Sequence, residues 1–339
     1  MKTLNLFVID SILQCFIVGQ ILNNFSNFKT EDNIIYITNN IVNESFKLEN
    51  FGKVVKINDD LTGKNLLKKR NVINKELNLL EQIFVDYDKI NIFMATLYKW
   101  NNILYNHFVK NNKNFTYINY PDGNDSLFFK KVSKKELIMR RIKCFICKLF
   151  NIDYCWNDVF KEDYLGISLA NKIYSYFPEL LECRFNKSII EIPMQKLRKN
   201  TGKESIIIFL GQVVEGGMKE DFYNKIDECF KYVSKQEQRW IYYKKHPRED
   251  IKLIEPLLRK YNFRIFEDER AIEEVIIENK YNVEKVYSYY SSGLINVKLI
   301  LGDNIKCIAY KGLKYYKINS DNAERLLSLY ERLGVEYVH

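Results

Sequence analysis

One uncharged run, Ser205-Ile-Ile-Ile-Phe-Leu210, ends directly at Gly211. An apolar run of this length is typical of a strand covered on both faces, as in a parallel sheet. A helical pattern follows from about Met218 to Lys235, and a second short strand is expected at Trp240–Tyr243. A strand, a helix and a strand of these lengths predict a βαβ unit.

The same alternation extends in both directions along the chain. Toward the C-terminus we expect strands at Phe263–Phe266, Val286–Tyr290 and Ile305–Tyr310, and helices near Asp250–Lys260, Ala271–Glu278, Gly293–Leu301 and Asn322–Leu333, the last closing the chain. Toward the N-terminus we expect strands at Leu4–Ile9, Ile34–Ile37, Val54–Ile57, Ile90–Leu97 and Phe115–Tyr120. We expect one helix whose N-cap lies near Asp10 or Ser11, and two more at Lys64–Phe84 and Trp100–Lys110. This order predicts an α/β protein with two Rossmann-like domains of parallel sheet that face a central cleft.

Length and composition agree with two globular domains. The chain has 339 residues, 47% of them apolar and 28% charged, which suggests about two domains at roughly 150 residues each and excludes a disordered chain or a simple coiled coil. A polar segment, Gln195–Lys203, separates the halves. We therefore predict an N-terminal domain over 1–195, a C-terminal domain over 196–320 and a C-terminal helix over 321–339.

Cysteine use and hydropathy bear on the compartment. Seven cysteines at irregular spacing do not form a disulfide framework, so we expect reduced thiols and a cytoplasmic protein. Cys144 and Cys147 have CxxC spacing but no second pair, which makes a zinc site a poor interpretation. Asp10 interrupts the apolar N-terminal stretch, and we expect neither a signal peptide nor a membrane span.

The residues that follow the predicted strands are small, polar or titratable. They read Pro121-Asp122-Gly123, Gly211-Gln212, His246-Pro247 and Ser291-Ser292. Ligands of parallel sheets bind outside the carboxyl ends of the strands, and no GxGxxG fingerprint is present. We therefore take these four segments as the candidate site.

His246 is the most informative of these residues. The chain holds only three histidines, and this one lies in Lys244-Lys-His-Pro-Arg-Glu249, directly after a strand. The proline can begin a helix, which leaves the imidazole at a helix N-terminus among cationic side chains. Such a place binds anions, above all phosphate, although a solvated basic turn is the alternative.

In this order, the motifs Asp122-Gly123, His246-Pro247 and Ser291-Ser292 resemble those of the bacterial sialyltransferases. The neighbourhoods Tyr243–Glu249 and Tyr287–Leu294 are similar to glycosyltransferase family 52, which contains lipooligosaccharide and capsule sialyltransferases. The resemblance covers most of the chain and is sharpest from Ile206 to Ile300. One departure concerns the acidic motif, where Pro121 stands in the place that often holds a second acid.

The resemblance implies a GT-B-like fold and inverting transfer of sialic acid from CMP-sialic acid to a terminal sugar hydroxyl, expected to be galactose, of a lipooligosaccharide or capsule glycan. Such a transfer needs a base for the acceptor proton and a group that offsets charge on the leaving phosphate. His246 is assigned to the phosphate. Asp122 is the first candidate for the base and Glu215 is its rival, while a turn-forming aspartate and a solvated loop acid are the structural alternatives. No metal or other cofactor is expected.

Further donor contacts follow from the same resemblance. Hydroxyl and backbone groups at a strand end could hold the phosphate or the sialic carboxylate, glycine could let the backbone approach the nucleotide, and cations could add positive potential. The candidates are Gly211, Gln212, Lys245, Pro247, Arg248, Ser291 and Ser292, together with Glu274 for the ribose, for which Glu273 is an equal claimant.

The positive charge is concentrated in one segment. From Lys130 to Lys148 the chain has eight Lys or Arg and a single acid, interleaved with apolar residues. This predicts a basic amphipathic helix near 130–150, suited to the anionic inner face of a bacterial membrane. Packing of its apolar face in a core or a dimer interface is the alternative. No nucleic-acid motif is present, and a homodimer is an expectation from the family.

Two other classes of function stay open at this point. One is another cell-surface polymer glycosyl- or glycerophosphotransferase with a GT-B fold. The other is a non-catalytic protein that binds a nucleotide-sugar or a membrane surface.

Overall fold

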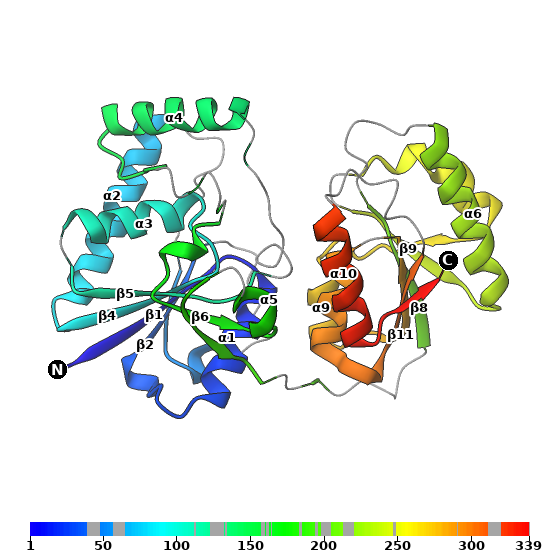
Figure 1. Ribbon diagram of the computed structural model, residues 1–339, viewed down its shortest axis with the longest axis horizontal. Coiled ribbons are helices and arrows are strands. Elements are labelled where there is room, and N and C mark those ends of the chain that lie inside the picture. Colours follow the sequence, from blue (N-terminus) through cyan, green and yellow to red (C-terminus); the bar gives the residue numbers. More distant parts are fainter. Residues whose placement is uncertain are drawn as a thin grey trace. The chain divides into compact units, whose positions relative to one another are not determined.

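The computed structural model describes residues 1–38, 48–56, 65–111, 113–122, 132, 134–156, 160, 163, 165–182, 185–193, 196–197, 205–212, 220–246, 249–289, 291–310 and 320–338. The chain divides into two compact units, Met1–Pro193 and Met194–His339. The predicted division, between 195 and 196, lies close to this boundary. Each unit is built on its own parallel sheet (Figure 1).

Unit 1 is a parallel sheet with the strand order β3-β2-β1-β4-β5-β6-β7. Its strands are β1 (Thr3–Ile9), β2 (Asn33–Ile37), β3 (Lys53–Lys56), β4 (Lys89–Met94), β5 (Phe115–Asn119), β6 (Lys172–Ser175) and β7 (Ser188–Glu191). Its helices are α1 (Ile12–Asn24), α2 (Leu66–Phe84), α3 (Lys99–Lys110), α4 (Lys134–Leu149) and α5 (Pro178–Glu182).

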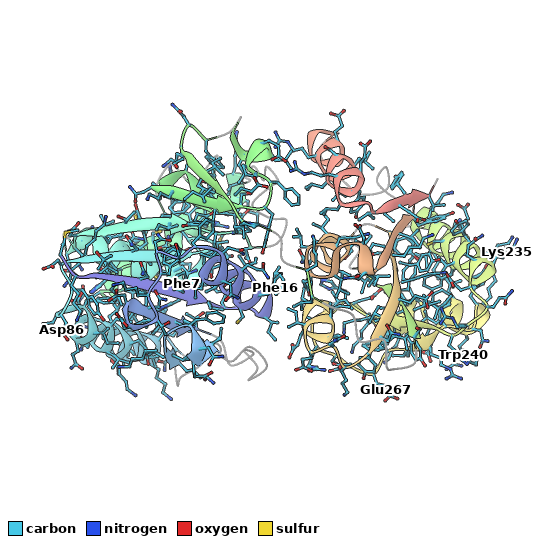
Figure 2. The ribbon with its side chains drawn as sticks, turned by 90° about the horizontal axis from the view of Figure 1, so that it is seen from below. Phe7, Phe16, Asp86, Lys235, Trp240 and Glu267 are labelled. Carbon is cyan, nitrogen blue, oxygen red and sulfur yellow. The ribbon has the colours of Figure 1, made fainter. Side chains whose placement is uncertain are left out.

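The core of unit 1 explains why the first strand is almost wholly apolar. Residues 4–9 of β1 are all buried, because β1 lies in the middle of the sheet between β2 and β4. Phe7 of β1 stacks on Phe93 of β4 with ring centroids 4.2 Å apart (Phe7 is labelled in Figure 2). A strand buried on both faces needs apolar residues at successive positions, which is the pattern that the sequence shows.

Unit 2 is a second parallel sheet with the order β10-β9-β8-β11-β12-β13. Its strands are β8 (Ser205–Leu210), β9 (Ile241–Lys244), β10 (Arg264–Ile265), β11 (Asn282–Ser288), β12 (Lys306–Tyr310) and β13 (Glu336–Val338), and its helices are α6 (Glu220–Gln236), α7 (Glu255–Lys260), α8 (Ile272–Ile277), α9 (Ser292–Leu301) and α10 (Ser320–Leu333). The helix α6 covers one face of the sheet, and α9 and α10 cover the other (Figure 1). Lys235, near the end of α6, points away from the sheet (Figure 2).

Both sheets contain a point at which the strand order reverses. In unit 1 the chain runs from β1 outward to β3 and then returns to β4, and in unit 2 it runs from β8 to β10 and returns to β11. Parallel sheets bind ligands at the carboxyl ends of the strands beside such a reversal. The segments after β1, β4 and β5 in unit 1 and after β8, β9 and β11 in unit 2 are therefore the places for a site.

The prediction that a helix closes the chain is wrong. After α10 the chain forms β13, which pairs in parallel with β12. Only the pairing with β12 defines this strand, because three residues are too few to show a hydropathy period. The strands β6 and β7 were also not predicted, for the same reason: each has only four residues.

Three structural findings concern metals, thiols and membranes. Among the described residues, no helix is long and apolar enough to cross a bilayer. No group of three or more His, Cys, Asp and Glu side chains within the described ranges could hold a metal ion. The six cysteines that the structure describes are all free thiols.

Candidate active site

Three neighbouring strands of unit 2 bring the predicted donor-binding segments together at the carboxyl ends of the strands, which we call the edge of the sheet below. Leu210 of β8 is paired with Lys244 of β9 on one side and with Ser288 of β11 on the other. The segments that follow these strands therefore emerge side by side. Adjacent strands lie about 4.8 Å apart, so the chain after β9 and the chain after β11 leave the sheet roughly 10 Å from one another.

Glu249 holds the loop that contains His246. The hydroxyl of Tyr243 donates to Glu249 Oε1 at 2.6 Å, and the backbone N–H of His246 donates to Glu249 Oε2 at 3.0 Å. The N–H of Glu249 in turn donates to the carbonyl of His246 at 2.9 Å. These bonds close a turn that leaves the imidazole half-buried at the sheet edge. Burial raises the pKa of the Glu249 carboxyl, and both bonds that it accepts oppose that rise.

Sequence reasoning did not single out Glu249 as a functional residue. The signal that could have found it is its spacing of three residues from His246. A carboxylate at that distance can accept a backbone N–H and fix a turn. Glu249 thus fixes the position of the loop that contains His246.

Gly211 leaves room for this arrangement. A Cβ atom at position 211 would overlap Glu249 Oε2 and the hydroxyl of Tyr243. The N–H of Gly211 donates to the carbonyl of Lys244 at 2.8 Å, which ties the end of β8 to the end of β9. Gly211 is buried and Gln212 is half-buried directly after it. The glycine is therefore needed for the close approach of Glu249, in addition to any contact with a nucleotide.

We expect Gly211→Ala to displace the His246 loop. The added methyl group must push apart the Tyr243–Glu249 pair, an overpacking that costs about 1–3 kcal/mol of stability. Thermal melting should show the destabilisation, and titration with the donor should show weaker binding. Gly19→Ala is the matched control, because nothing lies within 4 Å of a Cβ at that helical position; this variant should be as stable as the wild type or more stable. Equal melting temperatures for wild type and Gly211→Ala would contradict the packing argument.

Ser291 caps α9 at the same edge. Its side chain accepts the N–H of Gly293 at 3.1 Å, and its own N–H donates to the hydroxyl of Tyr330 at 3.3 Å. Ser292 is exposed as the first residue of α9. The N–H groups of a first helical turn have no partner within the helix and carry the positive end of its dipole. This end of α9 thus has the polarity that a phosphate or a carboxylate requires.

The lysines at the end of β9 have different surroundings. Lys244 is buried, its Nζ donates to the carbonyl of Asp268 at 2.7 Å, and burial lowers the pKa of its amine. Lys245 forms an ion pair of 3.0 Å with the exposed Glu269. Lys245 is therefore the lysine of this pair that is accessible at the surface.

The two acids proposed for the ribose differ in their contacts. Glu274 is buried, with Arg270 Nη1 at 3.7 Å from its Oε1, and burial raises the pKa of its carboxyl. Glu273 accepts a hydrogen bond of 2.6 Å from Asn296 Nδ2 on α9. Glu273 is thus hydrogen-bonded to α9, whose N-terminus lies at the site. Glu274 instead faces the guanidinium of Arg270, which lies just before α8.

In unit 1, Gln14 holds Asp122 at the end of β5. Gln14 Nε2 donates to Asp122 Oδ1 at 2.9 Å. Gln14 Oε1 accepts the N–H of Asp10 at 2.9 Å and the hydroxyl of Tyr120 at 3.1 Å. Gln14 and Tyr120 are both almost completely buried, whereas Asp122 is half-buried. A buried amide therefore fixes the carboxylate that we predicted as the base.

The same amide brings a second acid, Asp10, to this edge. Asp10 follows β1, and the protein atoms around its carboxyl raise its pKa, while Gln14 and Lys99 act in the opposite direction. Lys99 itself has a φ of 46°, a backbone conformation that is costly for a residue with a side chain and often found at functional sites. Of the two caps expected for α1, Asp10 and Ser11, the side chain that caps the helix is that of Ser11. Asp10 and Asp122, which follow β1 and β5, are thus both hydrogen-bonded to the side chain of Gln14.

Four residues of the predicted motifs lie outside the described residues. They are Gly123, Glu215, Pro247 and Arg248. Their roles stay predictions from the sequence.

One family model matches most of the chain. The family model of the alpha-2,8-polysialyltransferases matches residues 5–309, which reach from β1 to β12 and take in every strand end described above. The chain belongs to the alpha-2,8-polysialyltransferase family. This assignment supports the bacterial sialyltransferase class expected from the motifs, and it does not confirm glycosyltransferase family 52. None of the curated proteins matches the sequence.

Solved structures share the arrangement of two Rossmann-like domains. A putative UDP-N-acetylglucosamine 2-epimerase from Listeria monocytogenes superposes with a TM-score of 0.54 at 8% identity, covering 96% of this chain and 82% of the other. The UDP-GlcNAc 2-epimerase from Neisseria meningitidis gives 0.51 at 10% identity, covering 96% and 85%. A sialyltransferase from Photobacterium damsela gives 0.49 at 12% identity, covering 100% and 82%. The predicted GT-B-like α/β fold is confirmed, and at these identities the likeness concerns the fold alone.

Proposed function

We propose that the protein is an inverting sialyltransferase that moves sialic acid from CMP-sialic acid to a terminal sugar hydroxyl of a lipooligosaccharide or capsule glycan. The observation that carries the proposal is the match of the polysialyltransferase family model over residues 5–309. The chemistry of the two sheet edges supports it. One edge offers carboxylates. The other offers the imidazole of His246 and, about 10 Å away across β8, the N-terminus of α9. Contrary to the expectation from the sequence, His246 does not begin a helix itself, because the next described helical residues are Ile251–Leu253.

The proposed reaction assigns a separate task to each edge. A carboxylate of unit 1, Asp122 first, removes the proton of the acceptor hydroxyl, whose oxygen forms the new bond to the anomeric carbon of sialic acid. The bond from that carbon to the phosphate oxygen of CMP breaks at the same time. His246 and the N-terminus of α9 offset the negative charge that develops on the leaving phosphate. CMP leaves with the bonding electron pair, so no redox partner is needed.

The proposal also names the sugar that accepts the sialic acid. The family is named for transfer to the 8-position, which makes a terminal sialic acid the first acceptor to test and galactose the second. Either acceptor sugar would present a hydroxyl to the same base. Which sugar is used depends on which hydroxyl reaches Asp122.

The proposal also concerns cofactor, location and assembly. The phosphate charge is met by protein groups, so we propose a metal-independent transfer. We propose that the enzyme works in the cytoplasm at the inner face of the bacterial membrane, and that a homodimer is its assembled form.

A donor screen tests the proposed function. We expect CMP to raise the melting temperature and to give a heat signal in isothermal titration, with and without magnesium, because the phosphate site is built from protein donors. UDP and GDP should not stabilise the protein. A preference for CDP would point to a glycerophosphotransferase, and a preference for UDP or GDP to a different glycosyltransferase. Absence of binding to all of them would favour a non-catalytic protein.

A further inference from the structure

The helix α4 exposes an apolar stripe. Ile138, Ile142, Phe145 and Leu149 recur at the spacing of one helical face, and each has about half or more of its side-chain surface open to solvent; Phe145 is 63% exposed and Leu149 is 66% exposed. Met139 lies beside them and is also exposed. Large apolar side chains that gather on one face mark an interaction surface, whereas scattered ones do not.

The opposite face of α4 holds the helix to unit 1. Arg140 is buried, with its guanidinium 3.6 Å from the ring centroid of the buried Trp156, and its Nη2 lies 2.6 Å from Glu136. Lys143 Nζ lies 4.2 Å from the ring centroid of Tyr154. Because these contacts use the buried side of the helix, they keep the apolar stripe turned outward. Figure 1 shows α4 (green) at the periphery of unit 1, away from its sheet.

Positive charges border the stripe. Arg141 and Lys148 are exposed along one side of it, with Lys134 in the first turn, and Lys135 is exposed on the other side. The single acid of α4, Glu136, is neutralised by Arg140. An exposed apolar stripe between two basic margins has the shape of an interfacial helix, which buries its apolar face among acyl chains and places its cations among the headgroups.

We propose that α4 docks the protein on a membrane surface rich in anionic lipid, with Phe145 and its neighbours inserted at the level of the headgroups. The charge argues against a second copy of the chain as the occupant, because the same face of that copy has the same cations and the chain has a net charge of +9. Nucleic acid would satisfy the cations but would leave the apolar stripe in water. The proposal rests on the proposed function in one respect only, namely that a glycolipid acceptor would lie in the same membrane.

Liposome flotation tests the docking surface. We expect the protein to bind vesicles with about 30% phosphatidylglycerol in phosphatidylcholine and to bind pure phosphatidylcholine much more weakly. Binding should fall when the salt concentration rises to about 0.5 M, where the Debye length is only a few ångströms. Equal binding to both kinds of vesicle, or no binding to either, would overturn the proposal.

Two double variants separate the apolar and the basic contributions. Ile142→Ser with Phe145→Ser, and Arg141→Gln with Lys148→Gln, should each weaken binding to anionic vesicles by about tenfold or more. The matched controls remove equally exposed residues elsewhere: Val85→Ser with Leu253→Ser, and Lys231→Gln with Lys235→Gln. These controls should bind within about twofold of the wild type. A loss of binding as large in the controls as in the α4 variants would exclude α4 as the docking surface.

The α4 variants also separate this proposal from the proposed function. The substituted side chains are exposed, so the melting temperature and the affinity for CMP should not change. Transfer to a soluble acceptor should also be retained. A protein that binds anionic vesicles through α4 but does not bind CMP would contradict the proposed function and leave the docking surface standing; the reverse result would contradict the docking surface alone.

Discussion

Replacing His246 by alanine is expected to lower the rate of sialyl transfer by far more than tenfold. The imidazole lies in the turn that Glu249 closes, and in the proposed reaction it stabilises charge on the leaving phosphate. Loss of one such donor from an active site costs about 10²–10³ in rate. The measurement is the steady-state rate with CMP-sialic acid and a soluble acceptor.

The fold of His246→Ala should be intact. The backbone N–H of His246 donates to Glu249, and the side chain is not part of that bond, so the melting temperature should stay close to that of the wild type. Retention of more than about a tenth of the wild-type rate, a loss under ~1.4 kcal/mol, would show that the assigned role is wrong. A large fall in melting temperature would instead indicate a structural role.

Asp122→Asn is expected to have the second large effect, a fall of about 10²–10⁴ in the rate of transfer. Asparagine has nearly the same shape, and its amide oxygen can still accept the bond from Gln14 Nε2, but it cannot take up the acceptor proton. The affinity for CMP, measured by titration, should stay unchanged. The variant therefore separates loss of the base from loss of the fold.

Two further variants decide between the candidate bases. Glu215→Gln should keep most of the activity if Asp122 is the base, and a larger loss in Glu215→Gln than in Asp122→Asn would transfer the role to Glu215. Asp10→Asn removes the carboxylate of Asp10, the residue whose backbone N–H donates to Gln14 at this edge. Full activity in Asp122→Asn combined with a large loss in Asp10→Asn would make Asp10 the base.

Much of the fold could be predicted from hydropathy alone. The runs Leu4–Ile9 and Ser205–Leu210 are apolar at successive positions because both strands lie inside their sheets, and both are observed at these positions or within one residue of them. The helix α4 was predicted from its composition and is observed at Lys134–Leu149. The short strands β6, β7 and β13 could not be predicted, because three or four residues are too few to show a periodic pattern.

The candidate site divides in the same way. The order of Asp122, His246 and Ser291 along the chain, and their positions after strands, are properties of the sequence and led to the sialyltransferase class. Glu249, which holds the His246 loop, has a local signal in its spacing of three residues. The other contacts have none: Gln14 is more than a hundred positions from Asp122 and also accepts the N–H of Asp10, and Gly211 makes room for Glu249 only after β8 and β9 have paired.

The amino-acid sequence by itself determined most of the strands and helices, and which chemical groups follow them, because burial imposes a local pattern of apolar residues. Only the tertiary structure decided which of those groups share an edge, that Asp10 lies with Asp122 on one amide, and that the apolar side of α4 faces solvent while Arg140 is buried on Trp156. The physical reason is that pairing between strands and the choice of a buried helix face depend on contacts between distant residues, and such contacts have no period along the chain.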